Sequence, residues 1–240
     1  MPFLLALIPL TLGLAAVAEG GTSKLPTRSR ERFGARRTPM NSVPADPSAV
    51  VPAPLSFPMD ALEPDISLAT MAFHHDVLHA AYLQNARSRA AALSAGSGTP
   101  EDVDAEAYAT AGDVLHRVYW ATLSPVAGVR MPPELTTRLA QAFGSTATFG
   151  GLLFDLVRRI GGPGWVVLGY EPMNKRLLVY TVRGHLDGHV PGAIPILAVD
   201  AWEHAYQRDW GADRDGFLWA WLRHVDWSAV LDRLRAAEAA

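Results

Sequence analysis

The chain has 240 residues, with 21 Lys and Arg against 24 Asp and Glu, a formal net charge of −3 and no cysteine. This charge balance argues against a nucleic-acid partner, which a global basic field would attract. The lack of cysteine excludes disulfides, thiolate metal sites, iron–sulfur clusters and cysteine nucleophiles, so a metal must be held by His, Asp, Glu or water.

An apolar run from Phe3 to Ala18 opens the chain and ends in Ala-Val-Ala. It resembles a secretory signal with a small-x-small cleavage site before Glu19. Residues 1–18 are therefore predicted to be a signal peptide for export to the periplasm or the extracellular space. No Lys or Arg precedes the run, which leaves two alternatives: a lipid-facing anchor, or a start assigned too early, with Met40 opening a cytoplasmic protein. The run is short for a spanning helix, and no stable membrane partner is predicted.

Residues 19–56 have the composition of a linker. A basic patch from Arg28 to Arg37 is followed by a tract rich in Pro, Ala, Ser and Val up to Pro58. Such a segment cannot bury enough apolar surface to fold alone. The basic patch fits a solvated arm better than a contact with anionic lipid.

A first helix is predicted from about Leu68, capped by Asp65 or Ser67. One stripe at helical spacing contains Met71, His74, Leu78, Ala81, Tyr82 and Asn85. His75 and His79 have the i, i+4 spacing of many zinc sites, but no Glu or further His completes such a set. We interpret these two histidines as structural or surface residues.

A second helix is predicted over about 103–123, ending before Pro125. His116 and Trp120 lie four residues apart, so both side chains can face one pocket. Gly112 lies one turn earlier on the same face. A glycine inside a helix costs about 1 kcal/mol relative to alanine, which favours a role in making room for another side chain.

The second half is predicted to contain helices near 134–143 and 146–160, then three strands over 165–170, 177–182 and 193–199. A loop over 210–216 and closing helices over 217–224 and 227–237 follow. Helices followed by a small sheet that is itself flanked by helices indicate an α+β fold. We expect one domain over 57–127 and a second over 128–240.

The last predicted strand ends in Asp200, and His204 follows four residues later. A carboxylate at the end of a buried strand and an imidazole on the next helical turn offer two metal ligands on a rigid base. Taken alone, the pair also fits a capping aspartate beside a packed histidine. The other histidines decide between these interpretations.

Several short motifs occur in a specific order along residues 57–237. They are Asp60-Ala-Leu-Glu-Pro64, Met71-Ala-Phe-His-His75, Ala80-Ala-Tyr82, His116-Arg-Val-Tyr-Trp120, Phe143-Gly-Ser145, Gly164-Trp165 and Asp200-Ala-Trp-Glu-His-Ala-Tyr206. In this order they resemble the iron/manganese superoxide dismutase family. The resemblance implies an N-terminal helical hairpin followed by a C-terminal α/β domain, in which helices flank a small three-stranded antiparallel sheet. It also implies superoxide as the substrate.

The resemblance implies a metal site that holds one iron or manganese ion per subunit. Its ligands would be His74, His116, Asp200 and His204. Three neutral imidazoles and one carboxylate suit either ion, and dismutation needs a metal that alternates between +2 and +3. The resemblance further implies Tyr82 as a phenol at the entrance that passes protons, and tryptophan walls formed by Trp120, Trp165 and Trp202.

His185 takes the place of a glutamine that usually hydrogen-bonds the metal's solvent ligand in this family. The resemblance implies that His185 fills the space that Gly112 leaves. Such a donor tunes the reduction potential, and its identity slightly favours iron, or use of either metal, over strict manganese. The alternative is a loop histidine in solvent.

Two positions depart from the family pattern at the entrance. Leu78 stands where the family has a histidine, and Gln207 stands where it has the tyrosine that meets this histidine from a second subunit. Both halves of one hydrogen-bonded pair have changed, which indicates a rebuilt entrance. Glu203 is still expected to reach His204 of the partner subunit, which implies a homodimer.

Two other functions compete with a dismutase. The changes at Leu78 and Gln207 are also compatible with a non-catalytic or low-activity metal-binding relative of the same fold. A zinc hydrolase using the same histidines is a weaker alternative, because no glutamate is placed as its general base.

Overall fold

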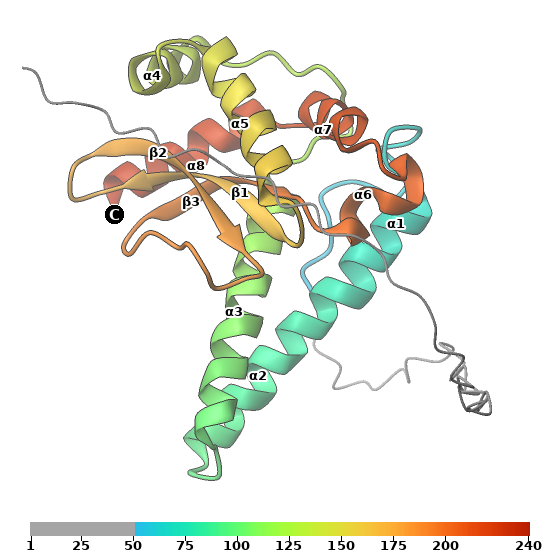
Figure 1. The fold of residues 1–240 in the computed structure, drawn as a ribbon, viewed down its shortest axis with the longest axis vertical. Coiled ribbons are helices and arrows are strands. Elements are labelled where there is room, and N and C mark those ends of the chain that lie inside the picture. The colour runs from blue at the N-terminus through green and yellow to red at the C-terminus, as the bar shows by residue number, and fades with distance from the viewer. Residues whose placement is uncertain (1–50) are drawn as a thin grey trace, which may run out of the picture. The chain divides into compact units, whose positions relative to one another are not determined.

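The computed structural model describes residues 51–240, so the predicted signal peptide and most of the predicted linker lie outside the described residues. The first helical elements are α1 (Leu68–Ala72), η1 (Phe73–His79), α2 (Ala80–Ser94) and α3 (Pro100–Ala121). They are followed by α4 (Pro133–Phe143), α5 (Thr146–Ile160), β1 (Gly164–Glu171), β2 (Arg176–Arg183), β3 (Ile194–Asp200), α6 (Glu203–Trp210), α7 (Arg214–Arg223) and α8 (Trp227–Ala239). The predicted α+β fold, a helical hairpin and then a three-stranded antiparallel sheet with helices around it, is confirmed (Figure 1). The predicted division into 57–127 and 128–240 stays a prediction.

The first helix contains a wide turn that its sequence pattern did not predict. Ser67 caps the helix by accepting a hydrogen bond from the Thr70 backbone N–H at 3.2 Å, so Ser67 and not Asp65 is the cap. Residues 73–79 then form a π-helix. The extra residue in each π turn changes which side chains face inward, and His75 and His79 are both buried. The surface interpretation of these two histidines was therefore wrong, and the structural one holds.

The start of α3 lies earlier in the chain than its apolar pattern indicated. Asp102 N donates to Thr99 Oγ1 at 3.3 Å, and Thr99 N donates to Asp102 Oδ2 at 2.9 Å. This reciprocal capping box begins the helix at Pro100, ahead of the first apolar residue of the periodic pattern. α3 then runs beside α2 as the second arm of the hairpin (Figure 1).

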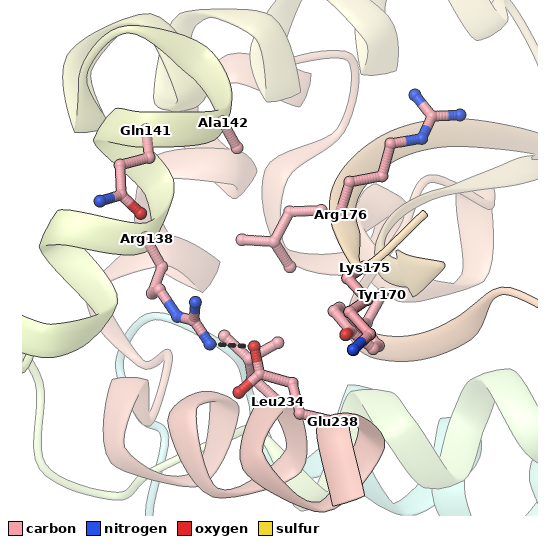
Figure 2. Close-up of a pocket in the computed structure, with 9 residues that line it drawn as sticks. Arg138, Gln141, Ala142, Tyr170, Lys175, Arg176, Leu234 and Glu238 are labelled. Carbon is pink, nitrogen blue, oxygen red and sulfur yellow. Dashed lines mark hydrogen bonds and ion pairs between the residues drawn. The ribbon is translucent and has the colours of Figure 1, made fainter. Parts of the chain in front are cut away.

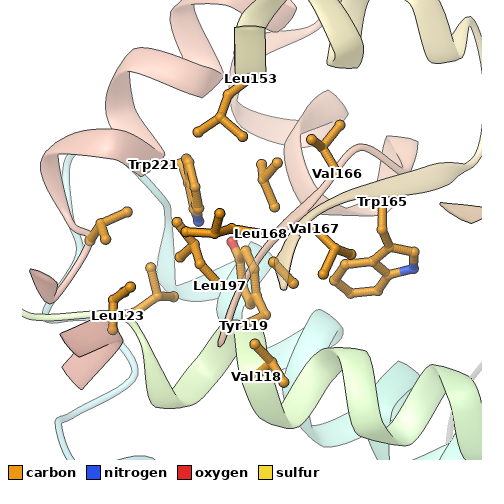
Figure 3. Close-up of a cluster of buried hydrophobic side chains, with 14 of the residues drawn as sticks. Val118, Tyr119, Leu123, Leu153, Trp165, Val166, Val167, Leu168, Leu197 and Trp221 are labelled. Carbon is orange, nitrogen blue, oxygen red and sulfur yellow. The ribbon is translucent and has the colours of Figure 1, made fainter. Parts of the chain in front are cut away.

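The sheet has the order β2-β1-β3, with both neighbours antiparallel to the central strand. Trp165 near the start of β1 pairs with Asp200 at the end of β3, whereas Tyr170 near the end of β1 pairs with Ile194. Side chains of α3 pack against β1 and β3 in one core that also includes residues of α5 and α7 (Figure 3). The core therefore fixes the end of β3 relative to the hairpin.

The segment 210–216, predicted as a loop, is mostly helical. α6 extends to Trp210, whose indole Nε1 donates to the Asp65 carbonyl at 2.8 Å. α7 begins at Arg214 because Asp213 Oδ1 accepts from the Gly216 N–H at 2.9 Å. Two glycines and three aspartate or arginine residues are typical of a turn, but the Asp213 cap starts a helix instead. Among residues 51–240, no helix combines the length and apolarity needed to cross a bilayer.

Asp65 ties the segment before α1 to the end of α7. Its carboxylate accepts from His224 Nε2 at 3.1 Å and from Arg223 Nε at 3.2 Å. Burial raises the pKa of Asp65, but Arg223 and His224 outweigh burial, and the pKa lies below its ordinary 3.8. The ionised form is therefore favoured in the folded protein.

Asp65→Asn is expected to lower the free energy of unfolding by about 2 kcal/mol at neutral pH, because the charge-assisted hydrogen bonds from Arg223 and His224 are weakened or lost. A carboxyl group whose pKa is lowered by folding stabilises the folded protein at pH values above its unfolded-state pKa. This stabilisation is lost as the pH falls through the folded-state pKa. The difference between the two proteins should thus shrink below pH 3.8. Urea unfolding over a pH series measures it. A difference that is constant in acid would contradict this role of Asp65.

Candidate metal centre

The four side chains that are predicted as metal ligands come from four elements and converge on one point. His74 comes from η1, His116 from α3, Asp200 from the end of β3 and His204 from the first turn of α6. One ligand atom from each lies within 4.8 Å of the others. Asp200 Oδ2 is at the centre, 3.0 Å from His74 Nε2, 3.1 Å from His204 Nε2 and 3.8 Å from His116 Nε2. The structure thus brings together the residues that the sequence places far apart.

Local hydrogen bonds orient these groups. Asp200 Oδ1 accepts from the Trp202 backbone N–H at 2.8 Å, which leaves Oδ2 directed at the imidazoles. His116 Nδ1 donates to the Gly112 carbonyl at 2.6 Å, so the lone pair of its Nε2 faces the centre. The Nε2 atoms of His74 and His116 are buried and have no hydrogen-bond partner among the described residues. Buried polar atoms are rarely left unpaired, and a cation at this point would satisfy both.

Burial sets the charge states that metal binding requires. It lowers the pKa of His74 to about 4, against the raising effect of Asp200, and it lowers the pKa of His116 well below the ordinary value. Burial alone would raise the pKa of Asp200, but His204 and His74 outweigh it, and the pKa lies far below its usual range. Neutral imidazoles and an ionised carboxylate are the ligand forms that iron and manganese accept. The residues therefore fit either ion.

Three tryptophans lie around the centre. The ring of Trp120 lies 4.7 Å from that of His74, Trp165 lies 4.9 Å from His116, and Trp202 lies 5.6 Å from His204. These indoles surround the four polar side chains with apolar surface. An apolar surround limits water access and thereby tunes the potential of a metal centre.

His185 is buried, so the alternative of a loop histidine in solvent is wrong. Its Nδ1 accepts from Trp165 Nε1 at 3.1 Å. Burial lowers the pKa of His185 to about 4, so the ring is neutral at neutral pH and carries its proton on Nε2. This Nε2 has no partner among the described residues. His185 therefore offers one unused hydrogen-bond donor next to the centre.

Gly112 provides the room in which Tyr82 and His185 lie. A β-carbon at position 112 would come within 3.0 Å of the Tyr82 ring and 3.4 Å of His185 Cδ2. The first contact is tighter than nine in ten β-carbon contacts in proteins, so a larger residue would require the Tyr82 ring to shift by a few tenths of an ångström. The glycine inside α3 is thus explained by close packing.

Tyr82 has a neighbour that the sequence reasoning missed. The Tyr82 ring lies 4.6 Å from His185 and 5.4 Å from His116, and Tyr108 lies 6.2 Å from Tyr82 and 4.8 Å from His185. Burial first, and then Tyr108, raises the pKa of the Tyr82 phenol. Tyr108 precedes Gly112 by four residues, one helical turn on the same face, and this spacing could have indicated it.

Asp113 was also missed, because its role depends on a contact between two helices. His79 Nε2 donates to Asp113 Oδ1 at 2.9 Å, and Asp113 Oδ2 accepts from Arg117 Nε at 2.8 Å. This chain of hydrogen bonds joins η1 to α3 beside His116. It holds together the two elements that carry His74 and His116.

Of the two residues that depart from the family pattern, Gln207 lies at the surface near His204. Leu78 is half-buried and Gln207 is exposed. A shallow pocket beside His204 is lined by Phe73, Glu203, His204, Gln207 and Arg208. Glu203 makes no hydrogen bond or ion pair with residues 51–240 of its own chain.

The fold and the centre together define an α+β protein whose residues 51–240 bring three histidines and one aspartate into a buried cluster that fits a metal ion. Comparison with known families agrees: the α-hairpin domain of iron/manganese superoxide dismutases matches residues 52–124, and their C-terminal domain matches residues 131–233. The chain therefore belongs to the iron/manganese superoxide dismutase family. It converts superoxide to dioxygen and hydrogen peroxide with an iron or manganese ion.

Its relatives include enzymes named for either metal. The chain is 35% identical over 186 residues to superoxide dismutase [Mn] of Haloarcula marismortui, covering 75% of this chain and 90% of the relative. It is 33% identical over 184 residues to superoxide dismutase [Mn] 2 of Halobacterium salinarum, covering 73% and 90%. It is 32% identical over 190 residues to superoxide dismutase [Fe] of Mycobacterium tuberculosis, covering 76% and 91%.

Proposed function

We propose that His74, His116, Asp200 and His204 are the residues that hold the ion of this superoxide dismutase. The observation that carries this assignment is the convergence of their four ligand atoms within 4.8 Å. The orphaned Nε2 atoms of His74 and His116 support it. Bound iron or manganese supplies the one-electron chemistry, so that two superoxide ions and two protons give one dioxygen and one hydrogen peroxide.

The protein contributes protons and enclosure around this chemistry. The Tyr82 hydroxyl keeps its proton across the neutral range, and its raised pKa extends this state to more alkaline pH, so it serves as the proton-holding group nearest the entrance. His185 Nε2–H donates toward the centre and fixes the position of a ligand or solvent there. Trp120, Trp165 and Trp202 exclude other water. Differences in these hydrogen bonds set the potential at which the ion alternates between its states.

Activity per bound metal tests the assignment. Purified protein loaded with iron or with manganese should dismutate superoxide in proportion to its metal content. A metal-replete protein without activity would support the non-catalytic alternative, which the named relatives do not favour. Elemental analysis of protein from its native compartment tests the preference for iron, or for use of either metal, that His185 suggests.

The rebuilt entrance predicts a gain of activity. Leu78→His together with Gln207→Tyr restores both members of the proton-relaying pair, and we expect activity per metal to rise about 10-fold if proton delivery limits turnover. Each single variant should raise the activity per metal only slightly, because the two residues of the pair act together. Stopped-flow decay of superoxide measures the rates. No gain in the double variant at equal metal content would show that Leu78 and Gln207 do not limit the enzyme.

We further propose a homodimer in which Glu203 accepts a hydrogen bond from His204 of the partner subunit. Glu203 has no partner in residues 51–240 of its own chain and lies beside its own His204 on a concave surface. Under a two-fold axis, such a contact occurs twice and orients both ligating imidazoles.

Glu203→Ala is expected to weaken the dimer and the metal site together, with metal affinity about 10–100-fold lower. Sedimentation at several concentrations and metal titration measure both effects. The exposed neighbour Arg208 supplies a control, Arg208→Ala, that keeps Glu203. A Glu203→Ala dimer with wild-type metal affinity would exclude the coupling.

We also propose export, on the basis of the apolar run and small-x-small site in residues 1–18. Cell fractionation and sequencing of the mature N-terminus test it. A mature protein that begins at Glu19 outside the cytoplasm is expected, whereas a cytoplasmic protein beginning at Met40 would refute export.

A further inference from the structure

We propose that a pocket at the far end of the sheet binds a small organic anion that carries a phosphate or carboxylate group on an apolar body. The pocket has a volume of about 340 Å³, within the range of small-molecule sites. It lies among α4, the β1–β2 hairpin and α8 (Figure 2). Nothing in the dismutase chemistry uses it.

The pocket is remote from the metal centre. Trp165 pairs with Asp200 at the metal end of the sheet, whereas Tyr170, which lines the pocket, pairs with Ile194. Five residues along β1 separate the two ends, which is roughly 16 Å of strand. A ligand in the pocket would therefore not touch the metal ligands.

Positive charge converges on the pocket from two sides. Figure 2 shows Arg138 on α4 and Lys175 on the hairpin on opposite sides of the gap, with Arg138 directed at Glu238 and the Arg176 guanidinium pointing away. Glu238 is the one carboxylate among the lining residues, and it is paired with Arg138. Lys175 has no ion pair or hydrogen bond with residues 51–240. Within the described part of the chain, one cation in the gap therefore has no counter-charge, and it lies beside a guanidinium that an ion pair holds in place.

The floor of the pocket is apolar. Tyr170 and Leu234 are buried and Leu177 is half-buried, and all three line the space between the charged groups. An inorganic ion would leave this surface uncovered. A ligand with an aromatic or aliphatic body would bury it, so the pocket suits an anion with an apolar part.

The backbone that presents Lys175 is held in an unusual conformation. Lys175 has φ +50°, in the left-handed region that favours glycine. The turn before it is fixed by the Glu171 carboxylate, which accepts from the Met173 N–H at 2.7 Å and from Asn174 Nδ2 at 2.6 Å. The fixed turn therefore sets the position from which the Lys175 side chain leaves the backbone.

Calorimetric titration of the metal-loaded protein tests this site. Phenyl phosphate, benzoate and inorganic phosphate are the three probes, and the first two distinguish a phosphate from a carboxylate as the preferred group. We expect one aromatic anion to bind with Kd below about 1 mM, and inorganic phosphate to bind at least 10-fold more weakly. Added salt should weaken binding.

Variants locate the site. Lys175→Gln and Arg138→Gln are each expected to weaken binding of the aromatic anion about 10-fold, whereas Lys175→Arg keeps the charge and should retain it. Arg159→Gln, an exposed arginine on α5, is the matched control. Arg138 also pairs with Glu238 on α8. If Arg138→Gln is unstable for this reason, the comparison of Lys175→Gln with Lys175→Arg decides the result.

Three results would overturn the proposal. They are no binding by either aromatic anion, equal binding of inorganic phosphate, and wild-type affinity in Lys175→Gln. All variants should keep wild-type dismutase activity per metal. Failure of this pocket is therefore distinguishable from failure of the assigned metal centre, which is read by metal content and activity alone.

Discussion

Replacing His116 with alanine is expected to remove the metal and at least about 100-fold of the dismutase activity. His116 is fully buried, and its Nδ1 is held by the Gly112 carbonyl at 2.6 Å, so no other side chain can take over its Nε2. The three remaining ligands would leave an open, weaker site. Elemental analysis and superoxide decay at equal protein concentration measure the two losses.

The control for this variant lies on the same helix. Val114 is exposed, so Val114→Ala should keep metal and activity at wild-type levels. Circular dichroism of apo His116→Ala separates loss of the ligand from loss of the fold. A folded His116→Ala protein that retained one tightly bound ion and full activity would show that the ion lies elsewhere.

Replacing His185 with alanine is expected to leave the ion bound and lower activity about 10–100-fold. The variant removes the donor at Nε2 and leaves Trp165 Nε1 without its acceptor at 3.1 Å. A donor near the ion stabilises one oxidation state over the other, so the reduction potential should move with the activity. Potentiometric titration of the loaded protein measures that shift directly.

A conservative variant separates the hydrogen bond from simple packing. His185→Gln keeps a donor in the same space and should recover part of the activity, while Leu186→Ala changes an exposed neighbour and should have no effect. If His185→Ala kept the wild-type potential and rate, the histidine would be a packing residue. The preference for iron, or for either metal, would then lose its basis.

Much of the fold was predictable from local patterns. The helix Thr146–Ile160 was predicted at its observed bounds, because Ser145 caps its start and Gly161, at φ +65°, ends it. The three strands were predicted within one residue at each end, since runs of apolar residues bounded by turn signals suffice to mark them. The start of α7 was missed because one aspartate side chain decides it.

The metal site also combines features that local sequence patterns predict with features that depend on how the chain packs. The sequence by itself supplied the residue types and the ordered motifs that contain His74, His116, Asp200 and His204. The spacing of Tyr108 from Gly112 could have indicated Tyr108, but the hydrogen bond between His79 and Asp113 depends on how two helices pack, so no local pattern contains it. The π turn over 73–79 was equally hidden, since its inward faces depend on contacts with α3.

The sequence therefore determined which groups are available, in what local order, and with which caps and turns. Only the tertiary structure decided that the ligand atoms of four distant residues lie within 4.8 Å of one another. It also decided their charge, because burial lowers the pKa of His74 to about 4 while neighbouring histidines keep Asp200 ionised. Proximity and desolvation are properties of the packed chain, and a list of residues contains neither.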